Sequence, residues 1–250
     1  METCFEKKYK IESSLADLER RYSIIGIQMH MQDAVSEHTA AWDIDAHSLK
    51  KNSNAFWVIL KTKICVFKQL QWNTFVDIKT YPLPPSLVRC DRECFFYDET
   101  GELAVSCETE WCILDCDTGK PRRVSSVCYP HDLEHMTERA EGPRPKRIVC
   151  DFSESDFSYE RIIRLTDLDM NYHTNNISYT RFAIDAFSAE ELKKNVISEY
   201  EINFENQSYE GETLRIYKKQ IGQNKYVVCG RAANSGRNVF ISEITMASCV

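Results

Sequence analysis

The chain lacks any long hydrophobic run. Hydrophobic residues make up 43% of its 250 residues, but no uninterrupted apolar stretch approaches the roughly 20 residues that a membrane-spanning helix needs. The opening M-E-T-C-F-E-K-K-Y-K carries charges of both signs and no apolar segment. We therefore expect no secretory signal, no transit peptide and no membrane span, and we predict a cytoplasmic location.

An excess of positive charge is also missing. The formal net charge is -7 and the sequence pI is about 5.5. Proteins that cover themselves with nucleic acid use surplus Lys and Arg to neutralise phosphates, so we expect no nucleic-acid partner. Basic residues instead gather with Pro and Gly between residues 117 and 150: Lys120, Arg122, Arg123, Arg139, Arg144, Lys146 and Arg147. This stretch predicts a linker whose basic surface is either merely solvated or a docking site for an acidic partner.

Cysteine is frequent, but its pattern indicates neither disulfides nor zinc. The 11 cysteines are odd in number and irregular in spacing, which predicts reduced thiols. Cys128, His131 and His135 have a spacing that could suggest a metal site. A structural zinc site needs a closed set of ligands, and no convincing further ligand is present. We favour solvated loop residues and predict no metal.

The chain does contain one order of elements twice. In the first half, a helical pattern is predicted from near Asp33, as the N-cap, to about Ala46. Runs rich in β-branched and aromatic residues then predict strands at Phe56–Phe67, Thr74–Tyr81, Val88–Tyr97 and Leu103–Asp115. The first half therefore reads as a helix followed by an antiparallel sheet.

The second half repeats this order. A strand pattern at Tyr159–Leu165 precedes a helix from about Asn176, and Ser188 with Glu191 predicts the capping box of a second short helix. Further strands are predicted at Glu199–Phe204, Thr213–Gln220, Tyr226–Ala233 and Val239–Met246.

Direct comparison of the halves supports an internal repeat. Residues 63–78 align without a gap over residues 201–216, with Gln69 over Gln207, and residues 105–111 resemble residues 240–246. We predict an N-terminal domain over residues 1–116, a linker over 117–150 and a C-terminal domain over 151–250.

Polar side chains gather in D-L-D-M-N-Y-H-T-N-N at residues 167–176. If this segment is extended, Asp169, Asn171 and His173 face one side. The helix N-terminus that follows would offer free N–H groups and a partial positive charge to a carbonyl oxygen. Asn171 could donate to the same oxygen, His173 could act as general base, and Asp169 could orient either of them. The same residues could simply be turn and cap residues, but their density before an apolar helix favours catalysis.

The matching region of the first half is predicted to be G-I-Q-M-H-M-Q-D at residues 26–33. It lacks the Asp-x-Asn-x-His set. We therefore predict one active site per chain.

These residues resemble the acyl-acyl carrier protein thioesterases, whose second half carries D-L-D-x-N-x-H-x-N-N-x-x-Y. The signature stands here as Asp167, Leu168, Asp169, Asn171, His173, Asn175, Asn176 and Tyr179. Further likeness lies in F-W-V-I-L at 56–60, Y-D-E-T-G-E at 97–102 and W-C-I-L-D-C-D-T-G-K-P-R-R-V at 111–124.

The resemblance implies an α+β fold of two tandem hot-dog domains, each a long helix packed on an antiparallel β-sheet. It implies hydrolysis of the thioester that joins a fatty acyl chain to acyl carrier protein, with no metal or organic cofactor. The family's catalytic Asp, Asn and His fall on Asp169, Asn171 and His173.

One departure from the family pattern affects the mechanism. Plant-type members carry a Glu-Cys pair on the strand after the helix, and the alignment puts Gln207 and Ser208 there. Gln207 cannot act as a base, and a Cys nucleophile is absent. Glu205 would share the face of Gln207 on a regular strand and could substitute. This favours direct attack by water, assisted by His173 or Glu205.

Other functions fit the same motif. A hot-dog thioesterase acting on acyl-CoA needs the same polarised carbonyl. A non-catalytic protein that binds acyl chains or carrier protein would explain Gln207. A hot-dog dehydratase fits less well, because the Asn-x-His pair suits carbonyl positioning better than C–H proton abstraction. We predict an acidic acyl carrier protein as the partner, because the linker is basic and Arg161 and Arg164 add positive charge. We predict that the protein is a monomer or a homodimer.

Overall fold

The computed structural model describes residues 2–130, 133–140, 142 and 144–248. They form two compact units, one made of residues up to Ala16 and Arg20–Pro145, the other of Asp17–Glu19 and the residues from Lys146 onward. The division at Pro145 lies within the predicted linker 117–150. The predicted boundaries at residues 116 and 151 stay a prediction.

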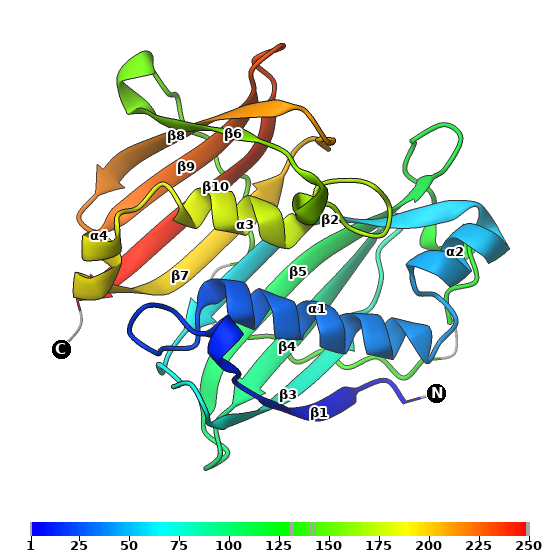
Figure 1. Ribbon diagram of the computed structural model, residues 1–250. Coiled ribbons are helices and arrows are strands. Elements are labelled where there is room, and N and C mark those ends of the chain that lie inside the picture. The colour runs from blue at the N-terminus through cyan, green and yellow to red at the C-terminus, as the bar shows by residue number, and fades with distance from the viewer. Residues whose placement is uncertain (1, 131–132, 141, 143, 249–250) are drawn as a thin grey trace. The chain divides into compact units, whose positions relative to one another are not determined.

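The first unit is an antiparallel sheet with a long helix lying across it (Figure 1). Its strands and helices are β1 (Phe5–Lys10), α1 (Ile24–Ala40), α2 (Ala46–Ser53), β2 (Ala55–Val66), β3 (Phe75–Pro82), β4 (Arg89–Tyr97) and β5 (Leu103–Asp115). The strand order is β1-β3-β4-β5-β2. The predicted strands are confirmed, and β1 is a strand that the sequence pattern did not predict.

Helix α1 begins earlier than predicted. Ile24, Ile27 and Met31 are buried and recur at helical spacing, and the Ser23 side chain caps the helix by accepting from the Gly26 N–H. The predicted helix from Asp33 to Ala46 is therefore wrong. The helix ends at Ala40, and Asp43, with a left-handed φ of 55°, separates it from α2.

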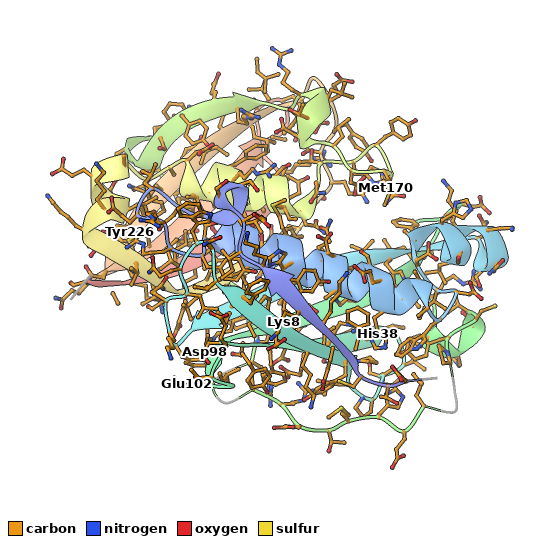
Figure 2. All side chains as sticks on the ribbon, turned by 60° about the horizontal axis from the view of Figure 1, so that its bottom comes forward. Lys8, His38, Asp98, Glu102, Met170 and Tyr226 are labelled. Carbon is orange, nitrogen blue, oxygen red and sulfur yellow. The ribbon has the colours of Figure 1, made fainter. Side chains whose placement is uncertain are left out.

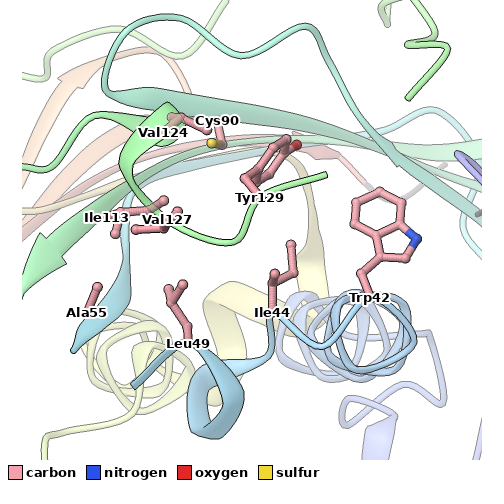
Figure 3. Packing of buried hydrophobic residues seen from close by; sticks show 9 residues of the cluster. All are labelled: Trp42, Ile44, Leu49, Ala55, Cys90, Ile113, Val124, Val127 and Tyr129. Carbon is pink, nitrogen blue, oxygen red and sulfur yellow. The ribbon is translucent and has the colours of Figure 1, made fainter. Parts of the chain in front are cut away.

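Helix α2 closes a small apolar cluster at the end of the first sheet (Figure 3). Leu49 of α2 packs there with Val124, Val127 and Tyr129, all of them buried. The start of the predicted linker is thus folded against the sheet rather than crossing through solvent.

The second unit repeats the first. Its elements are β6 (Phe157–Ile162), α3 (Asn176–Ile184), α4 (Ala189–Lys194), β7 (Asn195–Phe204), β8 (Thr213–Gly222), β9 (Lys225–Ala232) and β10 (Asn238–Ser248). The strand order β7-β10-β9-β8-β6 is that of the first unit. The Tyr179 ring of α3 packs on Phe240 and Phe204, with centroids 5.4 and 6.1 Å apart, and the predicted capping box of Ser188 and Glu191 is present.

Hydrogen bonds confirm the predicted alignment of the halves. The N–H groups of Phe67 and Lys68 both donate to the Ala104 carbonyl, and those of Glu205 and Asn206 both donate to the Val239 carbonyl. Each half therefore has the same bulge after its first long strand. The predicted strand Tyr159–Leu165 is shifted, because β6 ends at Ile162 and a 3₁₀ turn covers Leu165–Asp167.

No helix in the described ranges is long and apolar enough to cross a membrane.

Candidate active site

Residues 169–173 form a tight loop between β6 and α3, not an extended segment. The Asp169 N–H donates to the His173 carbonyl at 2.8 Å, and Tyr172 has a left-handed φ of 62°. The Asp169 carboxylate accepts the backbone N–H groups of Asn171 and His173 at 2.8 and 3.3 Å. The expectation that Asp169, Asn171 and His173 face one side of an extended chain is therefore wrong. Asp169 holds the loop backbone and does not contact the two side chains it was expected to orient.

The loop presents its side chains outward. Met170 is 92% exposed, Tyr172 is 80% exposed, and Asn171 is also exposed; Met170 lies at the loop tip (Figure 2). His173 is half-buried, with the edge of its ring against Tyr209 at 5.3 Å between centroids. Within the described residues, no side chain or backbone group hydrogen-bonds the Asn171 carboxamide or the His173 imidazole. Both groups are thus available to a substrate.

An ion pair between a buried carboxylate and a partly exposed guanidinium anchors the start of the loop. Asp167 accepts from the Arg161 guanidinium at 2.7 and 3.0 Å and from the Arg164 N–H at 2.8 Å. Its carbonyl accepts from the Asn175 N–H and the Ser178 hydroxyl. Asp167 therefore ties β6, the loop and the start of α3 together.

The N-terminus of α3 is largely capped. The Asn175 side chain accepts from the Ile177 N–H, and the Asn175 carbonyl accepts from the Ser178 N–H. Among the backbone N–H groups of Asn176, Ile177 and Ser178, that of Asn176 has no acceptor in the described residues. The expected row of free N–H groups is reduced to one donor, which joins the Asn171 carboxamide as a candidate for holding an oxyanion.

Ser208 is fixed beside the loop by the hydroxyl groups of Thr174 and Tyr179. Its carbonyl accepts from the Thr174 N–H and hydroxyl, and its own hydroxyl lies 2.8 Å from that of Thr174 and 2.9 Å from that of Tyr179. All three residues are buried. Ser208, which we predict to stand at the family's Cys position, contacts no base among the described residues. The geometry gives it no means of acting as a nucleophile.

Gln207 lies next to this anchor. Its side-chain Oε1 accepts from the Tyr209 hydroxyl at 3.2 Å, and Tyr209 contacts the His173 ring. The structure therefore brings the Gln207 segment close to the candidate base, and a catalytic role for Gln207 stays a prediction.

Glu205 does not join this group. Strand β7 ends at Phe204, and the bulge at Glu205 and Asn206 interrupts the alternation. The expectation that Glu205 shares the face of Gln207 on a regular strand is therefore wrong. Glu205 instead lies near Cys229, where burial first and the Glu205 charge among the lesser causes raise the pKa of the thiol to about 12. In the described part of the chain, no contact links Glu205 with His173.

The basic stretch 117–150 is mostly occupied. Arg139 and Arg144 contact Glu108 at 3.0 and 2.8 Å, and Lys146 contacts Glu243 at 2.9 Å. Basic residues of this stretch that have no ion-pair partner among the described residues are Lys120, Arg123 and Arg147. The occupied residues neutralise acidic side chains of the sheets, and a docking role for this stretch stays a prediction.

No metal site is found in the ranges that the structure covers, in the sense of three or more His, Cys, Asp or Glu side chains placed to hold an ion. His131, one of the three residues with suggestive spacing, lies outside the described residues. Every cysteine from Cys4 to Cys229 is a free thiol.

The first half carries a second loop of the same shape at residues 17–21. The Asp17 carboxylate accepts the Glu19 N–H at 2.9 Å, and Arg20 has a φ of 63°. The bridge between Ala16 and Tyr22 closes this loop as the bridge between Leu168 and Thr174 closes the other.

The predicted match at residues 26–33 is therefore wrong, because it depended on the misplaced first helix. Glu19 stands where Asn171 stands, and Arg21 stands where His173 stands. A carboxylate cannot donate to an oxyanion, and a guanidinium does not act as a base near neutral pH. The first loop therefore has the same backbone shape, but it lacks an oxyanion donor and a general base at these two positions.

Comparison with known families decides the identity of the chain. The family model of the acyl-ACP thioesterase N-terminal domain matches residues 2–129, and that of the C-terminal domain matches residues 151–245. The chain belongs to the acyl-ACP thioesterase family. Both halves of this acyl-ACP thioesterase family member are covered by the match.

Relatives of known sequence are distant. The chain is 22% identical over 202 residues to the chloroplastic palmitoyl-acyl carrier protein thioesterase of Cuphea hookeriana, covering 76% of this chain and 48% of the relative. It is 19% identical over 221 residues to the chloroplastic dodecanoyl-[acyl-carrier-protein] hydrolase of Umbellularia californica, covering 84% and 58%. The chain thus spans about half the length of the curated relatives it matches.

Solved structures establish the fold. An acyl-ACP thioesterase from Bacteroides thetaiotaomicron superposes with a TM-score of 0.86 at 18% identity, covering 98% of each chain. The 12:0-ACP thioesterase from Umbellularia californica gives a TM-score of 0.82 at 16% identity, covering 100% of this chain and 99% of the other. The predicted α+β fold of two tandem hot-dog domains is confirmed.

Proposed function

We propose that this protein hydrolyses the thioester between a fatty acyl chain and the phosphopantetheine arm of acyl carrier protein. Membership of the acyl-ACP thioesterase family supports this substrate class. The observation that carries the proposal is the loop at 169–173. Its backbone is held by Asp169, while the Asn171 carboxamide and the His173 imidazole are left without protein partners in the described residues.

The proposed reaction begins with the thioester carbonyl at the N-terminus of α3. The Asn171 side-chain N–H and the Asn176 backbone N–H would donate to its oxygen, which polarises the carbon. His173 would take a proton from a water molecule as the water oxygen bonds to that carbon. Collapse of the tetrahedral intermediate breaks the C–S bond, and the proton held by His173 passes to the leaving thiolate. The products are a fatty acid and the free carrier thiol.

No protein nucleophile is needed in this scheme. Ser208 is buried in its hydroxyl contacts, and Gln207 cannot take a proton. Water attack assisted by His173 therefore fits the side chains better than a covalent acyl-enzyme. Glu205 has no supporting contact, and we do not give it a role.

A side-by-side assay tests the substrate. Purified protein is given acyl chains of equal length on acyl carrier protein and on CoA, and thiol release is followed. Faster hydrolysis of the carrier-protein ester supports the proposal. Faster hydrolysis of the CoA ester supports the acyl-CoA alternative, and binding without thiol release supports the non-catalytic one.

Location and assembly are also proposed. The free thiols of the described cysteines support a reducing compartment, in keeping with the predicted cytoplasmic location. We expect a monomer or homodimer, because a tandem repeat supplies within one chain the pairing of two hot-dog domains. Light scattering of the purified protein distinguishes the two states.

A further inference from the structure

The two halves share one loop frame, so differences between them separate what the fold needs from what the site needs. The Thr174 N–H donates to the Ser208 carbonyl at 3.0 Å, and the Tyr22 N–H donates to the Leu70 carbonyl at 2.8 Å. This backbone bond is common to both halves. The first half adds a second backbone bond, from the Trp72 N–H to the Arg20 carbonyl at 2.8 Å, and the described residues of the second half show no counterpart to it.

The catalytic half adds three hydroxyl groups at this point. Thr174, Ser208 and Tyr179 are 4%, 0% and 3% exposed. The first half has Tyr22, Leu70 and Ile27 at the matching places, and neither Leu70 nor Ile27 carries a polar side chain. The fold therefore forms without this hydroxyl cluster, at the same position and with the same backbone bond.

The donors and acceptors of the cluster balance among themselves. Tyr179 accepts from the Ser208 N–H at 3.1 Å and can donate to the Ser208 hydroxyl at 2.9 Å. The Ser208 hydroxyl then donates to Thr174 Oγ1 at 2.8 Å, and Thr174 donates to the Ser208 carbonyl at 2.9 Å. Burial raises the pKa of Tyr179, which keeps its phenol protonated and able to donate. Each hydroxyl proton is used once, so the cluster is closed and specifies one arrangement.

The cluster connects the two segments that meet at the candidate base. Thr174 follows His173 directly. Ser208 lies between Gln207 and Tyr209, and Tyr209 packs against the His173 ring at 5.3 Å between centroids. A small movement of Ser208 relative to Thr174 would therefore move the Tyr209 ring that packs against His173.

We propose that Thr174, Ser208 and Tyr179 are positioning residues that fix the His173 imidazole relative to the thioester carbonyl. This inference rests on the proposed hydrolase function. Misplacement of a catalytic group by about 1 Å can cost on the order of 100-fold in rate. The cluster is buried and does not touch substrate, so its loss should lower kcat and leave KM nearly unchanged.

The test uses variants of the full chain that delete one hydroxyl and keep the shape. Thr174→Val and Tyr179→Phe should lower kcat by roughly 10- to 100-fold with KM within about threefold. Thr174→Ser keeps the hydroxyl and should restore most of the loss. Tyr22→Phe is the matched control, because it removes a buried tyrosine hydroxyl, bonded to His30 at 2.6 Å, from the other half. It should lower Tm comparably and leave kcat unchanged.

A second readout does not depend on turnover. NMR signals of the His173 ring should shift in Thr174→Val and Tyr179→Phe but not in Tyr22→Phe. Wild-type kcat and unchanged His173 signals in both deletion variants would overturn the inference, as would an equal loss of kcat in Tyr22→Phe. An inactive wild-type protein would overturn the proposed function instead, and the His173 signals would still decide the role of the cluster.

Discussion

Arg20 and Tyr172 occupy the same backbone position in the two halves, with φ values of 63° and 62°. A bulky residue in the left-handed region costs roughly 1–3 kcal/mol, so each must be held there by its surroundings. In each loop an Asp carboxylate accepts the backbone N–H of the residue two positions later. Asp17 accepts from Glu19, and Asp169 accepts from Asn171. The backbone shape of the candidate active-site loop is therefore common to both halves, and the side chains of the loop distinguish the second half.

Replacement of His173 by Ala should reduce kcat by at least about 100-fold, because general-base assistance contributes roughly 10²- to 10⁴-fold. Asn171→Ala should also lower kcat, through loss of one oxyanion donor. Asn171 is exposed and His173 is only partly buried with no hydrogen-bond partner among the described residues, so Tm should change little. His47→Ala, on the exposed face of α2, is the control and should behave as wild type. Full activity of His173→Ala, measured by thiol release, would rule out this base.

Gln207→Glu should raise kcat by about tenfold or more, because a carboxylate can help to accept the proton from water. Gln207→Ala should stay within about threefold of wild type in kcat, since a carboxamide cannot take a proton from water. The Tyr209 hydroxyl contacts Gln207 and can donate equally well to a carboxylate, so the substitution should fit. Stopped-flow thiol release measures both variants. A loss of activity in Gln207→Ala would show that the carboxamide itself participates.

A buried carboxyl group in the first half should make stability depend on pH. Glu93 is fully buried, and burial first and Glu108 second raise its pKa to about 7. The folded state therefore holds this proton more tightly than the unfolded state, whose Glu titrates near 4.3. Stability from this group is fully present below about pH 4.3 and is lost as the pH rises to about 7.

Glu93→Gln should remove this loss. As the pH rises from 4.5 to 8, the free energy of unfolding of wild type should fall relative to that of Glu93→Gln by up to about 3 kcal/mol. The lost contact with Arg144 at 3.4 Å partly offsets the advantage of the variant. Urea denaturation at several pH values measures the difference. Glu99→Gln, on an exposed turn, should leave the pH dependence unchanged. Parallel curves for wild type and Glu93→Gln would contradict the assignment.

The strands and the second helix could be predicted because their signals are local. The run Leu103–Asp115 is a strand over the predicted range, and Asn175 caps α3 where the polar cluster meets the apolar stripe. The first helix begins at Ile24 rather than after Asp33, because Ser23 is as good a cap residue as Asp33 and the buried stripe begins at Ile24. The predicted match at residues 26–33 depended on the position of this helix and is wrong for the same reason.

Other features could not be predicted because they depend on contacts that are distant in the sequence. Arg139 and Arg144 reach Glu108, which no pattern within residues 117–150 indicates. The bulge that separates Glu205 from Gln207 depends on the Val239 carbonyl of another strand. Periodicity assumes a regular strand, and sites are often built where strands stop being regular.

The ion pair of Arg161 and Asp167 has a natural replacement within the same chain. Tyr9 and Leu15 stand at the matching positions of the first half, and Tyr9 packs on His30 as Arg161 packs on Phe182. Arg161→Tyr alone leaves the buried Asp167 carboxylate without its ion-pair partner. Asp167→Leu alone leaves the Arg161 guanidinium without its ion-pair partner. Each should cost about 2–3 kcal/mol, less than a fully buried pair because Arg161 is partly exposed.

The double variant R161Y/D167L should be more stable than the sum of the single losses predicts, by at least about 1 kcal/mol, because it recreates the apolar arrangement of the first half. Urea denaturation of the four proteins gives this coupling directly. The exposed pair of Arg215 and Glu154, 2.8 Å apart, is the control and should show a coupling below about 1 kcal/mol, since solvent screens it. Additive losses for Arg161 and Asp167 would mean that the two halves tolerate different side chains here, and that the first half is no template for the second.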